Sequence, residues 1–239
     1  MEGVFERITW NSNYPNVDNE EKPSEEKEAM AFHWRHDDYP RPTVVCVHGF
    51  LATSWEFNNF YLGLKSLYDI GCDVVLKILP HHGRRNHPSP GPGGLHYVSG
   101  GIQNLNHSVI QSTYDIRSLI DYLIQEKGVN QVGLTGFSLG AYTASLMAGL
   151  DKRLSFVMPF NPIVSIPDAM MEWKPLDSIV KKIMQYKSLD LCDARYSMAI
   201  HSPLSLVPLL PADRLMIVAG RADRMASPRH AEALHKHWG

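Results

Sequence analysis

The chain has 239 residues and a formal net charge of −2, with 44% apolar and 20% charged residues, so it can bury a sizeable core and is not intrinsically disordered. The near-neutral charge excludes a basic field over the whole molecule, as found in proteins that attract nucleic acid or anionic lipid. Three cysteines are too few for a disulfide framework or a zinc site. No apolar stretch approaches the roughly 18 residues of a membrane helix. The acidic N-terminal segment lacks the apolar core of a signal peptide, so we expect a cytoplasmic protein.

Buried strands are predicted where short runs of β-branched and apolar residues lie between turn residues. The clearest run is Thr-Val-Val-Cys-Val at residues 43–47, which is typical of a strand buried on both faces. In chain order, the predicted strands are residues 4–10, 29–34, 43–47, 73–79, 131–135, 156–160 and 215–219.

Helices are predicted between these strands, where apolar residues recur at spacings of three and four. They are residues 58–68, about 106–127, 141–150 and 227–238, and Gly128 is expected to end the second of them. Strands that alternate with helices predict an α/β fold with a mostly parallel central sheet, covered by helices on both faces. We expect residues 1–239 to form a single domain of this kind.

Residues 167–210 interrupt the alternation. They contain a helical stretch at residues 177–186 and several prolines, and they carry an apolar stripe. Such insertions commonly cover a binding site near the carboxyl ends of strands, so we expect a small helical cap. The apolar stripe favours an acyl or other apolar substrate only weakly, because any cap helix needs such a stripe to pack.

Residues 136–140 read Gly-Phe-Ser-Leu-Gly, a G-x-S-x-G motif. The motif alone is weak, but here a predicted strand runs into it and a small-residue helix follows. A strand–turn–helix of this kind presents the serine as a nucleophile, with glycines that give clearance on either side. The helix start then directs backbone N–H groups toward an oxyanion beside Ser138. The alternative is a glycine-rich turn that happens to contain a serine.

Two further motifs follow predicted strands. His-Gly-Phe at residues 48–50 follows the strand at 43–47, and Gly-Arg-Ala-Asp at residues 220–223 follows the strand at 215–219. Together with His-Gly-Arg at residues 82–84 and the serine motif, they resemble the α/β hydrolases of the serine-nucleophile, esterase- or lipase-like type. The resemblance covers nearly everything from about residue 43 onward.

The resemblance implies a role for each matching residue. Ser138 would be the nucleophile, and the backbone N–H groups of Phe50 and Leu139 would form the oxyanion hole. Asp223 would orient a catalytic histidine, with Asp168 as the less favoured choice of acid and a solvated turn aspartate as the plain alternative. His48 would have a structural role. The resemblance implies neither a cofactor nor a metal.

The catalytic histidine is not identifiable. After Asp223 the family pattern needs a helix, a further strand and a loop that bears histidine, and the residues up to 239 accommodate one helix. His230, His235 and His237 fall on that helix and are expected to lie beside the sheet, away from the strand ends. We therefore expect a chain that is truncated before the histidine and lacks the last strand.

Several histidines between residues 81 and 107 could be interpreted as a metal cluster: His81, His82, His87, His96 and His107. Their spacing matches no familiar ligand pattern, and we expect no metal. Arg84 and Arg85 could bind an anionic group of a substrate, but a solvated pair is favoured.

These observations favour a serine hydrolase that cleaves a small-molecule ester or thioester through an acyl-enzyme on Ser138. The rival is a non-catalytic binding protein with this fold, or an inactive fragment. The absent histidine favours the rival, whereas a strained serine turn disfavours it because binding alone would not require the strain. A peptidase or an acyltransferase on the same scaffold is a third possibility.

Overall fold

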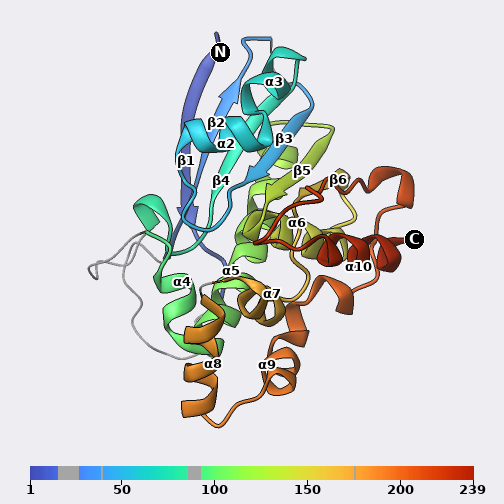
Figure 1. Cartoon of the computed structure of the whole chain (residues 1–239). Coiled ribbons are helices and arrows are strands. Elements are labelled where there is room, and N and C mark those ends of the chain that lie inside the picture. Colours follow the sequence, from blue (N-terminus) through green and yellow to red (C-terminus); the bar gives the residue numbers. More distant parts are fainter. Residues whose placement is uncertain (16–26, 39, 86–92, 175) are drawn as a thin grey trace.

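The computed structural model describes residues 1–15, 27–38, 40–85, 93–174 and 176–239 (Figure 1). These residues form a six-stranded sheet in the order β1-β2-β4-β3-β5-β6. Strand β2 is antiparallel to both β1 and β4, whereas β4, β3, β5 and β6 are mutually parallel. The predicted α/β class with a mostly parallel sheet is confirmed.

The strands lie within a few residues of their predicted positions. They are β1 (Val4–Asn11), β2 (Glu28–Arg35), β3 (Thr43–Val47), β4 (Asp73–Ile78), β5 (Val132–Phe137) and β6 (Leu154–Phe160). Every residue of β3 and β4 is buried, as expected for the centre of a sheet that is covered on both faces.

Helices cover the two faces of the sheet (Figure 1). They are α2 (Trp55–Leu62), α3 (Leu64–Asp69), α4 (His96–Ser99), α5 (Gly101–Asp121), α6 (Leu139–Ala148), α7 (Ile166–Glu172), α8 (Leu176–Tyr186), α9 (Leu191–Met198) and α10 (Pro228–Trp238). None of the helices in the described ranges is both long enough and apolar enough to cross a bilayer.

Alternate residues of β3 serve two hydrophobic clusters, as the two-residue period of a strand requires. Val44 and Cys46 pack in one cluster with residues of α2 and α3. Val45 and Val47 pack in the other cluster with residues of α5 and α6. Because β3, β5 and β6 are parallel, their carboxyl ends lie at the same edge of the sheet, between the two helical layers.

The helix predicted over residues 58–68 is wrong in one respect, because two helices occupy this stretch. Gly63 separates α2 from α3 and has φ of +62°, a left-handed conformation that ends the first helix. The helix predicted over about 106–127 begins earlier, at Gly101, and continues past α5 as a π-helical turn at Tyr122–Glu126. Gly128, with φ of +69°, follows that turn.

The strand predicted over residues 215–219 is present only as two isolated parallel bridges to β6, Val157–Leu215 and Phe160–Val218. The N–H groups of Met216 and Val218 donate to the carbonyls of Val157 and Pro159, at 3.1 and 3.0 Å. A regular parallel ladder would also need an N–H at residue 159, and proline has none. The missing donor explains why this segment does not form a regular strand.

Candidate active site

Ser138 lies at the turn between β5 and α6, as the sequence predicts. Its backbone has φ of 53° and ψ of −109°, a strained conformation for a non-glycine residue. Its N–H donates to the carbonyl of Phe160 at 3.0 Å, which ties the turn to the end of β6. The side chain of Ser138 is half-buried and does not cap α6, so capping does not occupy the hydroxyl.

Steric crowding requires glycine at both glycine positions of the motif. A Cβ at Gly136 would lie 2.3 Å from the backbone of Gly140, and a Cβ at Gly140 would lie 2.1 Å from the carbonyl oxygen of Val47. Both distances are far below any real carbon contact. The sharp turn at Ser138 therefore depends on glycine at both positions, and it brings α6 directly against the end of β3.

The loop after β3 is held by His48, whose side chain is fully buried. Its Nε2 accepts the N–H of Leu79 at 3.1 Å, so its Nδ1 carries the proton and donates to the carbonyl of Gly49 at 2.7 Å. Burial, followed by the nearby His82, lowers the pKa of His48 well below its usual value, so the ring is neutral.

The contact of His48 with Gly49 also orients Phe50. In a planar trans peptide the C=O and the next N–H point in opposite directions, so fixing the Gly49 carbonyl fixes the direction of the Phe50 N–H. The loop packs on the serine turn, because a Cβ at Gly49 would lie 3.0 Å from the Phe137 ring. The second predicted oxyanion donor, Leu139, is the first residue of α6, beside Ser138.

Asp223 lies in the loop that follows the bridged segment. Its Oδ1 accepts the N–H groups of Met225 and Ala226, at 2.7 and 2.9 Å, and its Oδ2 accepts Nδ2 of Asn161 at 2.7 Å. A carboxylate has about four acceptor positions, so one position remains for a further donor such as an imidazole N–H.

Asn161 joins the loop of Asp223 to the serine turn, and the sequence reasoning missed it. It follows Phe160, the acceptor of the Ser138 N–H, and its own N–H donates to Val218 at 2.7 Å. Its Oδ1 accepts the N–H of Gly220 at 2.8 Å. Asn161 has φ of +47°, which asparagine tolerates better than most residues. The Asn-Pro pair directly after β6 could have indicated a turn here, but not its contact with Asp223.

Residues 42–187 match the family model described as alpha/beta hydrolase fold. The chain belongs to the alpha/beta hydrolase fold family.

Similar solved structures agree with this assignment. The fold is similar to that of acetyl xylan esterase 1 from Thermoanaerobacterium sp. JW/SL YS485, with a TM-score of 0.65, 15% identity, and 89% of this chain and 70% of that chain covered. It is also similar to acylaminoacyl peptidase from Pyrococcus horikoshii, with a TM-score of 0.64, 12% identity, and coverage of 99% and 35%. At these identities the likeness concerns the fold.

An uncharacterized protein of Mycobacterium tuberculosis strain H37Rv is 31% identical over 207 residues, which cover 86% of this chain and 48% of that protein. The chain therefore spans about half the length of the curated relatives that it matches.

His230 and His237, near the C-terminal end of this hydrolase-fold chain, bond to residues that follow β6. Nδ1 of His230 accepts the N–H of Val164 at 3.4 Å, and its Nε2 lies 3.7 Å from a carboxylate oxygen of Glu172. Nε2 of His237 lies 2.8 Å from the carbonyl of Leu206. His235 is exposed and lines a groove beside the bridged segment. All three lie on α10, the helix on which the sequence predicts them.

Asp168, the less favoured acid, is occupied by other partners. Arg195 donates to both of its carboxylate oxygens, with Nε 3.0 Å from Oδ2, and the hydroxyl of Ser165 donates to Oδ2 as well. These hydrogen bonds, with that of Arg195 the strongest, lower the pKa of Asp168. The ion pair joins α7 to α9 and leaves Asp223 as the candidate acid.

The histidines after β4 are not gathered in one cluster. His82 is buried, with Nδ1 2.7 Å from the carbonyl of Pro80 and its ring edge against Phe50. The rings of His81 and His96 lie 5.0 Å apart, whereas His107 bonds to Tyr14. His87 lies outside the described residues. Among the described residues, no group of three or more His, Cys, Asp or Glu side chains could hold a metal ion.

The expectation that Arg84 and Arg85 are a solvated pair is wrong for Arg85. Arg84 is exposed, but Arg85 is buried, and its Nη1 lies 2.8 Å from the carboxylate of Asp115 and 3.0 Å from the carbonyl of Ile78. Lys77 lies 3.4 Å from the same carboxylate, and burial lowers the pKa of Lys77 to about 7. The ion pair with the buried carboxylate of Asp115 stabilises Arg85 in its buried position.

A groove of about 660 Å³ opens beside Asp223. On one side it is lined by residues at the end of α7 and the start of α8, including Trp173 and Asp177. On the other side it is lined by the loop from Asp223 to Arg229. The inserted segment 167–210 thus contributes a wall to the groove that contains the candidate acid.

Proposed function

We propose that this chain is the catalytic portion of a serine hydrolase that cleaves a carboxylic ester or thioester through an acyl-enzyme on Ser138. The observation that carries the proposal is the strained backbone of Ser138, at φ of 53°, in a turn that only glycines at positions 136 and 140 permit. Strain of about 1–3 kcal/mol persists where the surroundings impose it, and it is concentrated at functional sites.

The proposed mechanism uses the neighbouring groups as follows. The Ser138 hydroxyl attacks the carbonyl carbon, and the N–H groups of Phe50 and Leu139 stabilise the oxyanion of the tetrahedral intermediate. His48 supports this step through the Gly49 carbonyl, which directs the Phe50 N–H. Asp223, held by Asn161, would orient a catalytic histidine that the sequence does not identify. Its imidazole would accept the serine proton and return it to the leaving alcohol or thiol as the acyl-enzyme forms, and water would then release the acid. The similarity of fold to an esterase supports this class of reaction.

A serine-reactive fluorophosphonate tests whether the hydroxyl oxygen of Ser138 is nucleophilic. Wild-type protein should be labelled, Ser138→Ala should not, and the matched control Ser165→Ala should be labelled like wild type, because Ser165 bonds to Asp168 in the cap. Equal labelling of wild type and Ser138→Ala would contradict the proposal.

The second candidate is a binding protein that keeps the fold without the chemistry. It is favoured by the positions of His230 and His237, whose ring nitrogens face Val164, Glu172 and Leu206. A serine hydroxyl without a general base is a weak nucleophile at neutral pH. Turnover of a short-chain nitrophenyl ester by wild type, lost in Ser138→Ala, would decide for the hydrolase.

A further inference from the structure

The outward side of α8 is apolar and open to solvent. Ile179, Ile183 and Tyr186 are spaced four and three residues apart, so they lie on one side of the helix. Their exposures are 54%, 55% and 86%. Val180 and Met184, on the neighbouring side, are half-buried. Only part of the apolar side of α8 therefore packs against other residues. Packing alone does not explain why Ile179, Ile183 and Tyr186 are apolar.

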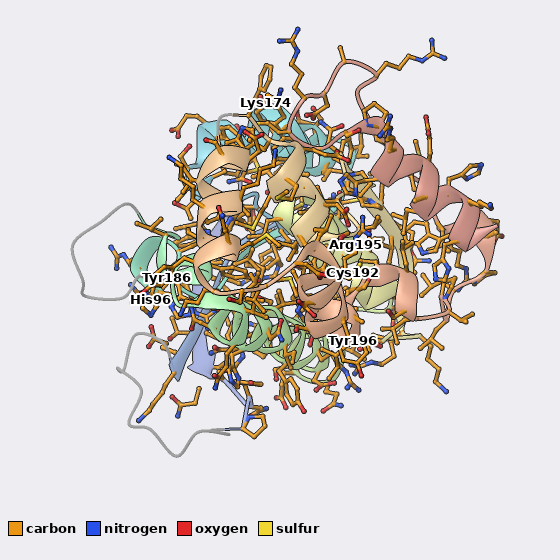
Figure 2. The ribbon with its side chains drawn as sticks, turned by 60° about the horizontal axis from the view of Figure 1, so that its bottom comes forward. His96, Lys174, Tyr186, Cys192, Arg195 and Tyr196 are labelled. Carbon is orange, nitrogen blue, oxygen red and sulfur yellow. The ribbon has the colours of Figure 1, made fainter. Side chains whose placement is uncertain are left out.

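Helix α8 stands at one end of the molecule and packs mainly against α7 (Figure 1). Figure 2 views this end and shows Lys174 near one end of α8 and Tyr186 near the other. The exposed apolar side chains are therefore within reach of a flat surface that approaches this end.

The charge around this face is positive, in contrast to the molecule as a whole. Residues 173–189 contain four lysines and one aspartate, a net charge of +3, whereas the chain carries −2. Glu172 and Asp190 lie directly outside this range and reduce the net charge of residues 172–190 to +1. Lys181 pairs with Asp177 at 3.2 Å. The other three, Lys174, Lys182 and Lys187, are exposed and form no ion pair within the described part of the chain.

We propose that α8 is a peripheral anchor that binds an anionic lipid surface. Ile179, Ile183 and Tyr186 would insert at the boundary between headgroups and acyl chains, and the lysines would contact the headgroups. A helix that separates a lysine-bearing polar side from an apolar side, with low mean hydropathy overall, is the pattern that lies in a membrane interface without spanning it. The positive charge around the apolar side favours an anionic lipid over a neutral surface.

The anchor leaves the groove beside Asp223 open. Asp177 and Lys181 line the groove beside Asp223, and at 100° per residue they lie on the side of α8 away from Ile179 and Ile183. A lipid surface bound to the apolar side would thus not fill the groove. The inference concerns binding and does not depend on the proposed ester cleavage.

Co-sedimentation with phosphatidylcholine vesicles, with and without phosphatidylglycerol, tests the anchor. Wild type should sediment with the anionic vesicles, and the double variant Ile179→Gln/Ile183→Gln should bind at least about tenfold more weakly. Glutamine is a good helix former and both positions are exposed, so the fold should persist, as circular dichroism would show. The matched control is Ile70→Gln, an isoleucine that is 76% exposed just after α3.

A second arm tests the charge. Lys182→Glu/Lys187→Glu should weaken binding to the anionic vesicles by more than about tenfold, whereas Lys152→Glu, at an exposed position before β6, should not. The proposal is overturned if wild type sediments with neither vesicle, if it binds both equally, or if the isoleucine variant binds like wild type. It is also overturned if sedimentation velocity shows a dimer that the isoleucine variant abolishes, since a second copy would then occupy the face.

Discussion

Three residues fix the backbone around Ser138, each through a different kind of contact. Gly140 allows α6 to meet the end of β3, because its lack of a Cβ leaves room for the carbonyl of Val47. His48 holds the carbonyl of Gly49 from within the core. Asn161 connects the end of β6 to Asp223 through its side-chain amide. A glycine, a neutral imidazole and an amide thus set the geometry at three strand ends.

Gly140→Ala should destabilise the protein by about 1–3 kcal/mol or more, because its methyl group would lie 2.1 Å from the Val47 carbonyl oxygen and the backbone would have to shift. Urea unfolding followed by circular dichroism measures the change. Gly220→Ala is the matched control, since the nearest atoms to a Cβ there are 3.9 Å away. Equal unfolding midpoints for the two variants would show that α6 and β3 can separate at no cost.

At this scale the sequence could predict the serine turn but not its supports. Ser138 and its glycines are neighbours in the chain, so the local pattern identifies them. Asn161 meets Asp223 across 62 positions, and Arg85 meets a buried aspartate thirty residues further along the chain. The residues that surround Asn161 and Arg85 in the sequence do not indicate that these side chains bind Asp223 and Asp115.

At the scale of elements, the inserted segment 167–210 is joined to the helices beside the sheet by a buried polar contact. The hydroxyl of Tyr142, on α6, lies 2.7 Å from Nδ1 of His201 and 3.0 Å from the His201 carbonyl. Nε2 of His201 lies 2.8 Å from Oδ1 of Asn106 on α5. Asn106 also donates to the carbonyl of Ser197 at 3.0 Å. These bonds join the end of α9 to both α5 and α6.

Tyr142→Phe should lower the free energy of unfolding by about 1–3 kcal/mol, because it leaves polar atoms of buried His201 without their partner. Thermal or urea unfolding measures the loss. The control is Tyr196→Phe on α9, whose side chain is 86% exposed and should tolerate the change. If Tyr142→Phe were as stable as the control, the inserted segment 167–210 would be held by its apolar contacts alone.

The sequence predicted the existence of most elements but missed three features: the solvent-exposed side of α8, the break at Gly63 and the incomplete pairing of residues 215–219. Apolar spacing identified α8, but spacing is the same whether a stripe packs or faces solvent, and Ile183 is exposed. The break at Gly63 needed knowledge of its positive φ, which glycine permits without requiring it. Pairing of residues 215–219 with β6 failed in part because Pro159 lies on the partner strand.

At the scale of the whole molecule, the described residues bury several histidines in the neutral form. Burial lowers the pKa of His33, His82 and His201 to about 4 in each case, and that of His48 well below 6.5. In the unfolded chain each imidazole binds a proton near pH 6.5, whereas the folded form does not. Below about pH 6.5 the unfolded state therefore binds more protons than the folded state does.

The free energy of unfolding should consequently fall between pH 6.5 and about 4, by up to about 1.4 kcal/mol per pH unit for each such histidine. Urea unfolding at pH 6.5, 5.7 and 5.0 measures the slope before most carboxylates titrate (about pH 4). His82→Asn should make the slope shallower by about 1 kcal/mol per pH unit, whereas His235→Asn, at an exposed position, should not change it. A wild-type slope near zero would mean that the buried rings are protonated in the folded protein.

The proline in β6 has a further consequence for the loop that carries Asp223. Because Pro159 offers no donor, the carbonyl of Met216 lacks the ladder bond that would anchor the middle of the bridged segment. The segment should open as a local unit well below the free energy of global unfolding, with early amide hydrogen exchange at Met216 and Val218. Asn161 bonds Asp223 through its side chain and Val218 through its N–H, so it contacts both the carboxylate and the bridged segment. Its side-chain bond would keep the Asp223 carboxylate beside the end of β6 when the middle of the segment opens.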